Sequence, residues 1–180
     1  SPRTRLVAVT GASNLIGTRP PVAEIARLVH DAGALLAVDG VHLTAHAPVD
    51  VRALGADFFA CSPYKFLGPH CGVLAARPEL LEELRPAKLA PSSDAVPERF
   101  ELGTLPYELL AGTTAAVDFL AGLDPAAGGT RRERLTASLT AVERHEDRLR
   151  HRIEDGLAEL ASNSGAGVVV HSRAQSRTPT

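Results

Sequence analysis

The sequence predicts an α/β fold built on a mostly parallel sheet. Two observations lead to this prediction: short apolar runs lack the alternation of a half-exposed strand, and stretches with helical spacing separate these runs. Strands that are buried on both faces have continuous apolar sequences, and such strands belong to parallel sheets that helices cover on both sides. We therefore expect a central sheet with a helical layer on each face.

The elements of this sheet follow one another along the first half of the chain. Apolar runs predict strands at residues 5–10, 34–39, 57–61 and 72–76. Helical spacing predicts helices at residues 20–33, 49–54 and 78–84. Pro20 and Pro21 suit the first turn of the first helix, where proline lacks only an amide that would have no partner, and Gly33 ends that helix.

A change in composition divides the chain into two expected domains, residues 1–123 and residues 124–180. Residues 86–100 are rich in proline and predict an excursion, and a helix is expected at 106–120. Residues 124–130 are rich in Gly, Ala and Pro, which is typical of a linker. Beyond them, apolar residues from Leu135 to Leu160 recur at helical spacing on a long amphipathic helix, and a strand is expected at 168–171.

Composition excludes several classes of function. The net charge is −2 with both signs interspersed, so bulk electrostatics indicate neither a nucleic-acid nor a membrane partner. No apolar stretch approaches the ~20 residues that span a bilayer. The two cysteines, Cys61 and Cys71, form neither a disulfide framework nor a metal-binding pattern, so no metal is expected. We expect a cytoplasmic protein, and the lack of any methionine predicts a piece of a longer one.

Lys65 is the strongest candidate for chemistry. The chain has two lysines, Lys65 and Lys88, against seventeen arginines. A primary amine can lose its proton and attack a carbonyl, whereas a guanidinium stays charged. Lys65 also follows an apolar strand and precedes a turn at Gly68, so the strand would deliver its side chain to a loop.

Other polar residues also follow strand ends. Asn14 lies after the first expected strand, Asp39 ends the second, His42 comes three residues later, and Ser62 follows the third with Lys65. The carboxyl ends of parallel strands meet at one crevice. Together these groups suit pyridoxal 5'-phosphate (PLP), which needs an amine for its aldehyde, a carboxylate for its ring nitrogen and donors for its hydroxyl and phosphate.

Four segments resemble successive motifs of the class V aminotransferases, in that family's order. They are Ser13-Asn14-Leu15-Ile16-Gly17-Thr18, Val38-Asp39-Gly40-Val41-His42, Ser62-Pro63-Tyr64-Lys65-Phe66-Leu67-Gly68-Pro69 and Phe100-Glu101-Leu102-Gly103-Thr104. The match covers roughly residues 5–122 and is closest to the cysteine-desulfurase-like branch. The resemblance implies part of the large domain of a fold-type I PLP enzyme, followed by the start of a smaller α+β domain.

The resemblance also implies a role for each site residue. Lys65 would form an internal aldimine with PLP and transfer protons at the α carbon of an amino-acid substrate. Asp39 would pair with the pyridine nitrogen, while Asn14 and His42 would lie at the ring face and phenolic oxygen. Two hydroxyls would bind phosphate, Ser62 in its own subunit and Thr104 in the partner subunit of a homodimer.

This sequence departs from the family at several points. Many desulfurases have Gln at the position of His42 and His at the position of Tyr64. The glycine-rich phosphate loop, the residue that stacks on the ring, the arginine for the substrate carboxylate and the sulfur-accepting cysteine are absent from this sequence. Neither Cys61 nor Cys71 matches that cysteine.

Two other interpretations remain open at this stage. Residues 9–17 resemble the glycine-rich turn of NAD(P)-binding short-chain dehydrogenases, and Asp39 follows about twenty residues later. Against this, Leu15 stands where the middle glycine would be, and Pro20 delays the helix that should face the pyrophosphate. The second alternative is a non-catalytic, truncated remnant of a PLP enzyme.

Overall fold

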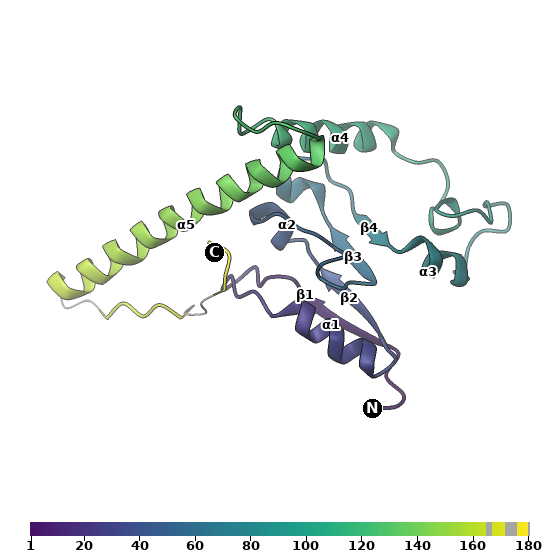
Figure 1. The fold of residues 1–180 in the computed structure, drawn as a ribbon, viewed down its shortest axis with the longest axis horizontal. Coiled ribbons are helices and arrows are strands. Elements are labelled where there is room, and N and C mark those ends of the chain that lie inside the picture. Colours follow the sequence, from purple (N-terminus) through teal and green to yellow (C-terminus); the bar gives the residue numbers. More distant parts are fainter. Residues whose placement is uncertain (165–166, 172–175, 180) are drawn as a thin grey trace.

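The computed structural model describes residues 1–164, 167–171 and 176–179. Its centre is a four-stranded sheet in the order β1–β2–β3–β4 (Figure 1). The strands are β1 (Leu6–Thr10), β2 (Leu35–Asp39), β3 (Phe58–Cys61) and β4 (Val73–Ala76). The first three strands run parallel, and β4 runs antiparallel to β3. The mostly parallel sheet that the sequence predicts is confirmed.

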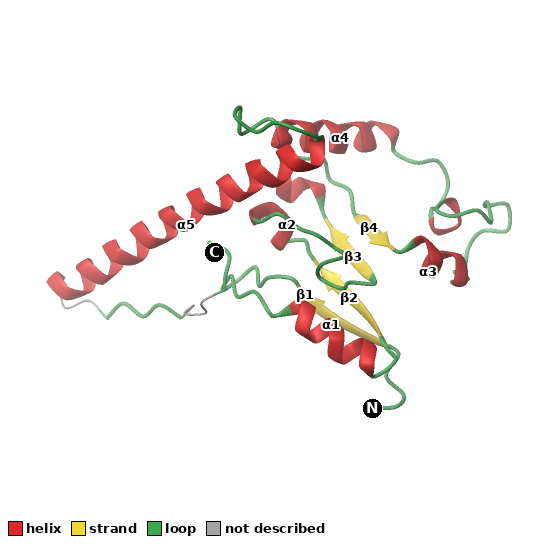
Figure 2. Cartoon of the chain, in the orientation of Figure 1, coloured by secondary structure: helices red, strands yellow, loops and turns green. Residues whose placement is uncertain are grey.

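Helices connect and flank these strands (Figure 2). The α-helices are α1 (Val22–Asp31), α2 (Leu43–His46), α3 (Pro78–Glu83), α4 (Tyr107–Ala121) and α5 (Arg131–Ser164). Two single 3₁₀ turns are η1 (Pro63–Phe66) and η2 (Glu98–Phe100). The helices expected at 20–33, 78–84 and 106–120 and the long helix beyond residue 130 are therefore confirmed. None of the five is both long and apolar enough to cross a membrane.

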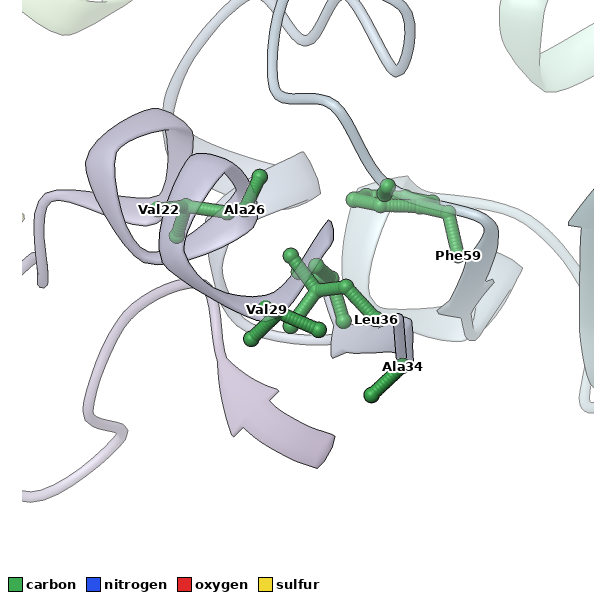
Figure 3. Close-up of a cluster of buried hydrophobic side chains, with 8 residues drawn as sticks. Val22, Ala26, Val29, Ala34, Leu36 and Phe59 are labelled. Atoms are coloured by element: carbon green, nitrogen blue, oxygen red, sulfur yellow. The ribbon is translucent and has the colours of Figure 1, made fainter. Parts of the chain in front are cut away.

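The main core lies between α1 and one face of the sheet (Figure 3). Val22, Ala26 and Val29 recur on one side of α1 and pack against Leu36 and Phe59 of the strands. Full burial of each larger side chain contributes roughly 1.5–3 kcal/mol. This packing fixes β2 and β3, whose carboxyl ends carry the candidate site.

The buried carboxylate of Asp57 joins three segments at the end of the sheet opposite the candidate site. Asp57, 3% exposed, accepts hydrogen bonds from the Leu36 amide and from an Arg77 guanidinium N–H, each at 2.8 Å. His30 Nε2 lies 2.8 Å from Oδ2, the oxygen that also accepts the Leu36 amide, whereas Arg77 donates to Oδ1. Burial alone would raise the pKa of Asp57, but the Leu36 amide, His30 and Arg77 together lower it below its usual value. Asp57 thereby links α1, β2 and the segment after β4.

Replacing Asp57 with Asn in the full-length protein should lower the free energy of unfolding by about 2 kcal/mol at neutral pH. Asn can keep its amide oxygen toward the Leu36 amide and His30, but its NH2 group then faces Arg77 and cannot accept from the guanidinium. Because the pKa of Asp57 is lowered in the folded state, its contribution is complete above the ordinary aspartate value and is lost as pH falls through the folded value. The difference from wild type should therefore shrink below about pH 4.

Urea denaturation at neutral and acidic pH measures both effects. Asp118→Asn is the matched control, since Asp118 forms an exposed ion pair with Arg131 and should matter by less than about 1 kcal/mol. Equal stability of Asp57→Asn and wild type at neutral pH would contradict the role of Asp57.

The short helix predicted at 49–54 is wrong. The structure has a hydrogen-bonded turn there, and the short helix of this region is α2, which comes earlier. Asp50 Oδ1 accepts the amides of Arg52 and Ala53 at 2.9 and 3.1 Å, and Gly55 at φ +69° ends the turn. Asp50 thus caps a helical start, but the left-handed conformation of Gly55 ends the turn before a second turn can form.

The strand predicted at 168–171 is also wrong. These residues have no regular secondary structure. Within the described ranges, no strand lies beside them to supply hydrogen bonds, and β propensity alone does not hold a single strand. The chain instead forms one isolated antiparallel bridge further on, between Thr18 and Arg177.

A helical layer on both faces of the sheet was expected, and the described part of the chain provides it on one face. On the face opposite α1, a hollow of about 490 Å³ lies over apolar side chains that include Ala37, Phe58 and Ala60. Leu6 and Leu74 on β1 and β4 are 53% and 65% exposed. Both faces of the sheet carry apolar side chains. Among the described elements, α1 covers one of these faces, and the other is left open.

Helix α5 extends past the rest of the molecule (Figure 1). Its first turns pack against α4 and bury Leu139, and Ser138 Oγ accepts the Asp124 amide at 3.0 Å. Further along, Leu149, Ile153 and Leu160 are 45%, 63% and 52% exposed. The apolar stripe predicted on this helix is therefore buried at one end and open at the other.

The 180-residue chain on its own should not behave as a monodisperse monomer, because the open sheet face and the α5 stripe expose contiguous apolar surface. Size-exclusion chromatography with light scattering measures this. Leu149→Glu combined with Ile153→Glu should reduce the association, whereas Leu28→Glu on α1, which is 66% exposed but lies elsewhere, should not. A compact monomer at all concentrations would contradict the expectation.

Candidate active site

The carboxyl ends of the three parallel strands enclose a small polar pocket of about 220 Å³. Four of the residues that the sequence singled out line it: Asn14, Asp39, His42 and Lys65. The remaining lining residues are Thr10, Ala12, Val41 and Tyr64. The pocket therefore collects side chains from the loops after β1, β2 and β3.

Asp39 is the last residue of β2, and a tight turn follows it. Its Oδ1 accepts the Val41 amide at 3.0 Å. A Cβ at Gly40 would lie 2.0 Å from Phe59 Cζ, so only glycine lets this turn pack against β3. The side chain is exposed at the pocket, and no described residue donates a hydrogen bond to Oδ2. The second oxygen is thus available to a ligand.

Lys65 lies on η1, directly after β3. Pro63 opens this turn, and the Lys65 amide donates to Ser62 O at 3.0 Å. Leu67 ends it in the left-handed region at φ +68°, which is uncommon for a side chain other than Gly, Asn or Asp. The turn directs Lys65 to the pocket, where the amine is exposed and lies 5.3 Å from the centre of the Tyr64 ring.

Tyr64 forms a wall beside this lysine. Its ring stacks on His70, with centroids 5.1 Å apart and planes within 9°. Many desulfurases have His at the position of Tyr64, and no role could be predicted for this residue from the sequence. The structure brings it to the pocket next to Lys65, where an aromatic face can hold the flexible lysine side chain.

His42 directly precedes α2, and its side chain is half-buried at the pocket. Its Nε2 lies 2.9 Å from Thr178 Oγ1, and its ring centre lies 4.5 Å from that of His46. Burial lowers the pKa of His42, and the positive charges of His46, Lys65 and Arg19 lower it further. The imidazole is therefore neutral near pH 7.

Asn14 lies in the loop after β1. Ser13 Oγ accepts the amides of Leu15 and Ile16 at 3.3 Å, and Thr10 Oγ1 donates to Ala12 O at 2.7 Å. These bonds shape the loop so that Asn14 lines the pocket with an exposed amide. The Ser13 hydroxyl also occupies amides that a dinucleotide-binding turn would present to phosphate.

Ser62 and Thr104 do not line this pocket. Ser62 precedes η1 with its side chain half-buried, and Thr104 is exposed in the loop before α4. Thr104 was expected to act in the pocket of a partner subunit, and that assignment stays a prediction. Sequence reasoning missed Thr178, which contacts His42 from 136 positions further along the chain. No sequence motif around Thr178 indicates this contact.

The cysteines also lie outside the pocket. Burial raises the pKa of Cys61, with a further contribution from Cys71, so this thiol is less readily ionised. Cys71 Sγ lies 3.5 Å from Thr113 Oγ1 on α4. The burial of Cys61 therefore disfavours a nucleophilic thiolate there.

The sequence profile of the class-V aminotransferases matches residues 1–178. The chain belongs to the aminotransferase class-V family. This finding replaces the dehydrogenase-like alternative and agrees with the position of α1, which begins only at Val22, well after the glycine-rich turn.

Known relatives place the chain near the cysteine desulfurases. It is 41% identical over 135 residues to a cysteine desulfurase of Klebsiella pneumoniae, covering 68% of this chain and 33% of that protein. It is 34% identical over 172 residues to a probable cysteine desulfurase of Halalkalibacterium halodurans, covering 89% and 39%. The structure of the Escherichia coli cysteine desulfurase CsdA is similar with a TM-score of 0.70 and 30% identity, over 88% and 39% of the two chains. The chain thus spans about a third of the length of these relatives.

The family implies PLP, and the residues of the pocket suit the reactive end of this cofactor. They include one primary amine, one carboxylate with an oxygen that no described residue occupies, one amide and one neutral imidazole. These are the groups that an aldehyde, a pyridine nitrogen and a phenolic oxygen require. The pocket residues therefore fit the ring of PLP, while the candidate phosphate ligands Ser62 and Thr104 lie outside the pocket.

Proposed function

We propose that the full-length protein is a PLP-dependent enzyme that acts on an amino acid and that this chain supplies its covalent lysine. The observation that supports the proposal is the convergence of Lys65, Asp39, Asn14 and His42 on one pocket from three successive strand ends. Four residues that suit the aldehyde, the pyridine nitrogen, the phenolic oxygen and the ring face of one cofactor would rarely meet by chance. When bound, PLP supplies an electron sink for charge at the substrate α carbon.

Each side chain would have a distinct task. Lys65 Nζ would bond the cofactor aldehyde and, when released, would take up and deliver protons at the substrate α carbon. The Asp39 carboxylate would keep a proton on the pyridine nitrogen. Asn14 and His42 would orient the ring through its face and phenolic oxygen.

The phosphate ligands and the assembly are part of the same proposal. Ser62 would bind phosphate in its own subunit, and Thr104 would do so across a cytoplasmic homodimer. Residues 1–123 would belong to the large, cofactor-binding domain, and residues 124–180 would begin a smaller domain. The packing of α5 on α4 across the 122–130 loop gives the two parts a shared border.

Borohydride trapping tests the proposal directly. Full-length protein is incubated with PLP, reduced, digested and mapped by mass spectrometry, and the pyridoxyl group is expected on the peptide that contains Lys65. Lys88 is the internal control, because its amine donates to Ser92 O at 2.8 Å and pairs with Asp94 at 3.1 Å, outside the pocket. Label on Lys88 alone, or no label on either lysine, would contradict the proposal.

A further inference from the structure

The end of the described chain is seated beside the pocket. We call residues 176–179 the C-terminal strap. The Arg19 amide donates to Ser176 O at 3.0 Å, and the Thr178 amide donates to Gly17 O at 2.8 Å. Arg177 forms an ion pair with Glu154 of α5, and both side chains are largely buried. The strap is therefore held by the loop after β1 and by α5 together.

Thr178 of the strap packs closely against the loop that contains Gly17. Thr178 is fully buried, at 0% exposure. Gly17 has φ +69°, and a Cβ there would lie 2.5 Å from Thr178 O, so any other residue at position 17 would push the strap away. The loop that carries Asn14 and the strap that carries Thr178 thus depend on each other.

The hydroxyl of Thr178 joins this seat to the pocket. Its Oγ1 donates to Gly17 O at 3.3 Å and lies 2.9 Å from His42 Nε2. A hydroxyl has one proton, so a hydroxyl that donates to Gly17 accepts from His42. His42 then carries its proton on Nε2, and in the neutral ring Nδ1 holds the lone pair.

We propose that Thr178 is a positioning residue of the active site, which holds His42 as the Nε2–H tautomer in one orientation at the pocket wall. The ring would then present a fixed face to whatever binds beside Lys65. The lowered pKa of His42 supports this assignment, because a neutral ring has a tautomer to select. The effect on cofactor binding rests on the proposed function, whereas the tautomer assignment does not.

NMR of the full-length protein without cofactor tests the tautomer. Long-range ¹H–¹⁵N correlations report which ring nitrogen is protonated, and loss of one signal set in His42→Gln assigns His42. Wild type is expected as Nε2–H. Thr178→Val keeps the shape but removes the hydroxyl, and should shift the tautomer ratio about fivefold, as expected for the loss of one hydrogen bond. Thr178→Ser should restore the wild-type ratio.

The wild-type spectrum decides the tautomer even where Thr178→Val fails to fold: an Nδ1–H tautomer, or an even mixture, would overturn the proposal. A PLP titration by absorbance is the second readout, with Kd expected to rise about fivefold in Thr178→Val and to stay unchanged in Thr178→Ser. A shifted tautomer with unchanged Kd would overturn the positioning role. Failure of wild type to bind PLP would overturn the proposed function and leave the tautomer result standing.

Discussion

Replacing Lys65 with Ala in the full-length protein is expected to abolish borohydride-trappable PLP and to lower turnover at least about a thousandfold, or about 4 kcal/mol of transition-state stabilisation. Lys65 is the one amine in the pocket, and Ala can neither bond the aldehyde nor move protons. Lys65→Arg should be as inactive, because a guanidinium retains the positive charge and stays protonated. Absorbance spectra and steady-state kinetics measure the two losses.

Lys88→Ala is the matched control for this experiment. It removes the chain's other lysine, whose amine is bonded to Ser92 and Asp94 in the segment before η2. Wild-type turnover and labelling are expected for it. A Lys65→Ala variant that keeps both trapped cofactor and wild-type turnover would show that another amine does the chemistry.

The sheet could be predicted because its signals are local. Each of the four strands is an apolar run of four or five residues, and α1 has an apolar side at Val22, Ala26 and Val29 that any window of ten residues reveals. The two wrong predictions, the helix at 49–54 and the strand at 168–171, fall where the local sequence pattern does not decide the structure. At 49–54 the left-handed Gly55 ends the helical turn as soon as it forms, and at 168–171 no described strand lies beside the strand-forming residues.

The candidate site could be predicted where strand order decides it. Asn14, Asp39 and Lys65 follow the ends of adjacent parallel strands, so their proximity follows from topology before any side chain is placed. Contacts that depend on how distant segments fold back could not be predicted. Thr178 reaches His42 through a long excursion along α5, and His46 meets Glu146 of the same helix at 3.0 Å.

Replacing Asp39 with Asn is expected to keep some PLP binding but to lower turnover roughly a hundredfold or more, about 3 kcal/mol of transition-state stabilisation. Asn can still accept the Val41 amide, so the turn after β2 should survive. It has no negative charge, so it cannot hold a proton on the pyridine nitrogen and the electron sink weakens. The loss should therefore appear mainly in kcat, with bound cofactor measured separately by absorbance.

Asp50→Asn is the matched control for Asp39→Asn. Asp50 is exposed, and its Oδ1 accepts the amide two residues later at 2.9 Å, as Asp39 accepts Val41 at 3.0 Å, but Asp50 does not line the pocket. Both variants therefore remove one carboxylate charge from the same kind of turn, and only one removes it from the site. Turnover of Asp50→Asn should match wild type within about twofold. Equal turnover in Asp39→Asn would remove Asp39 from the chemistry, whereas an equal loss in both variants would trace the effect to the turns rather than to the charge beside the cofactor.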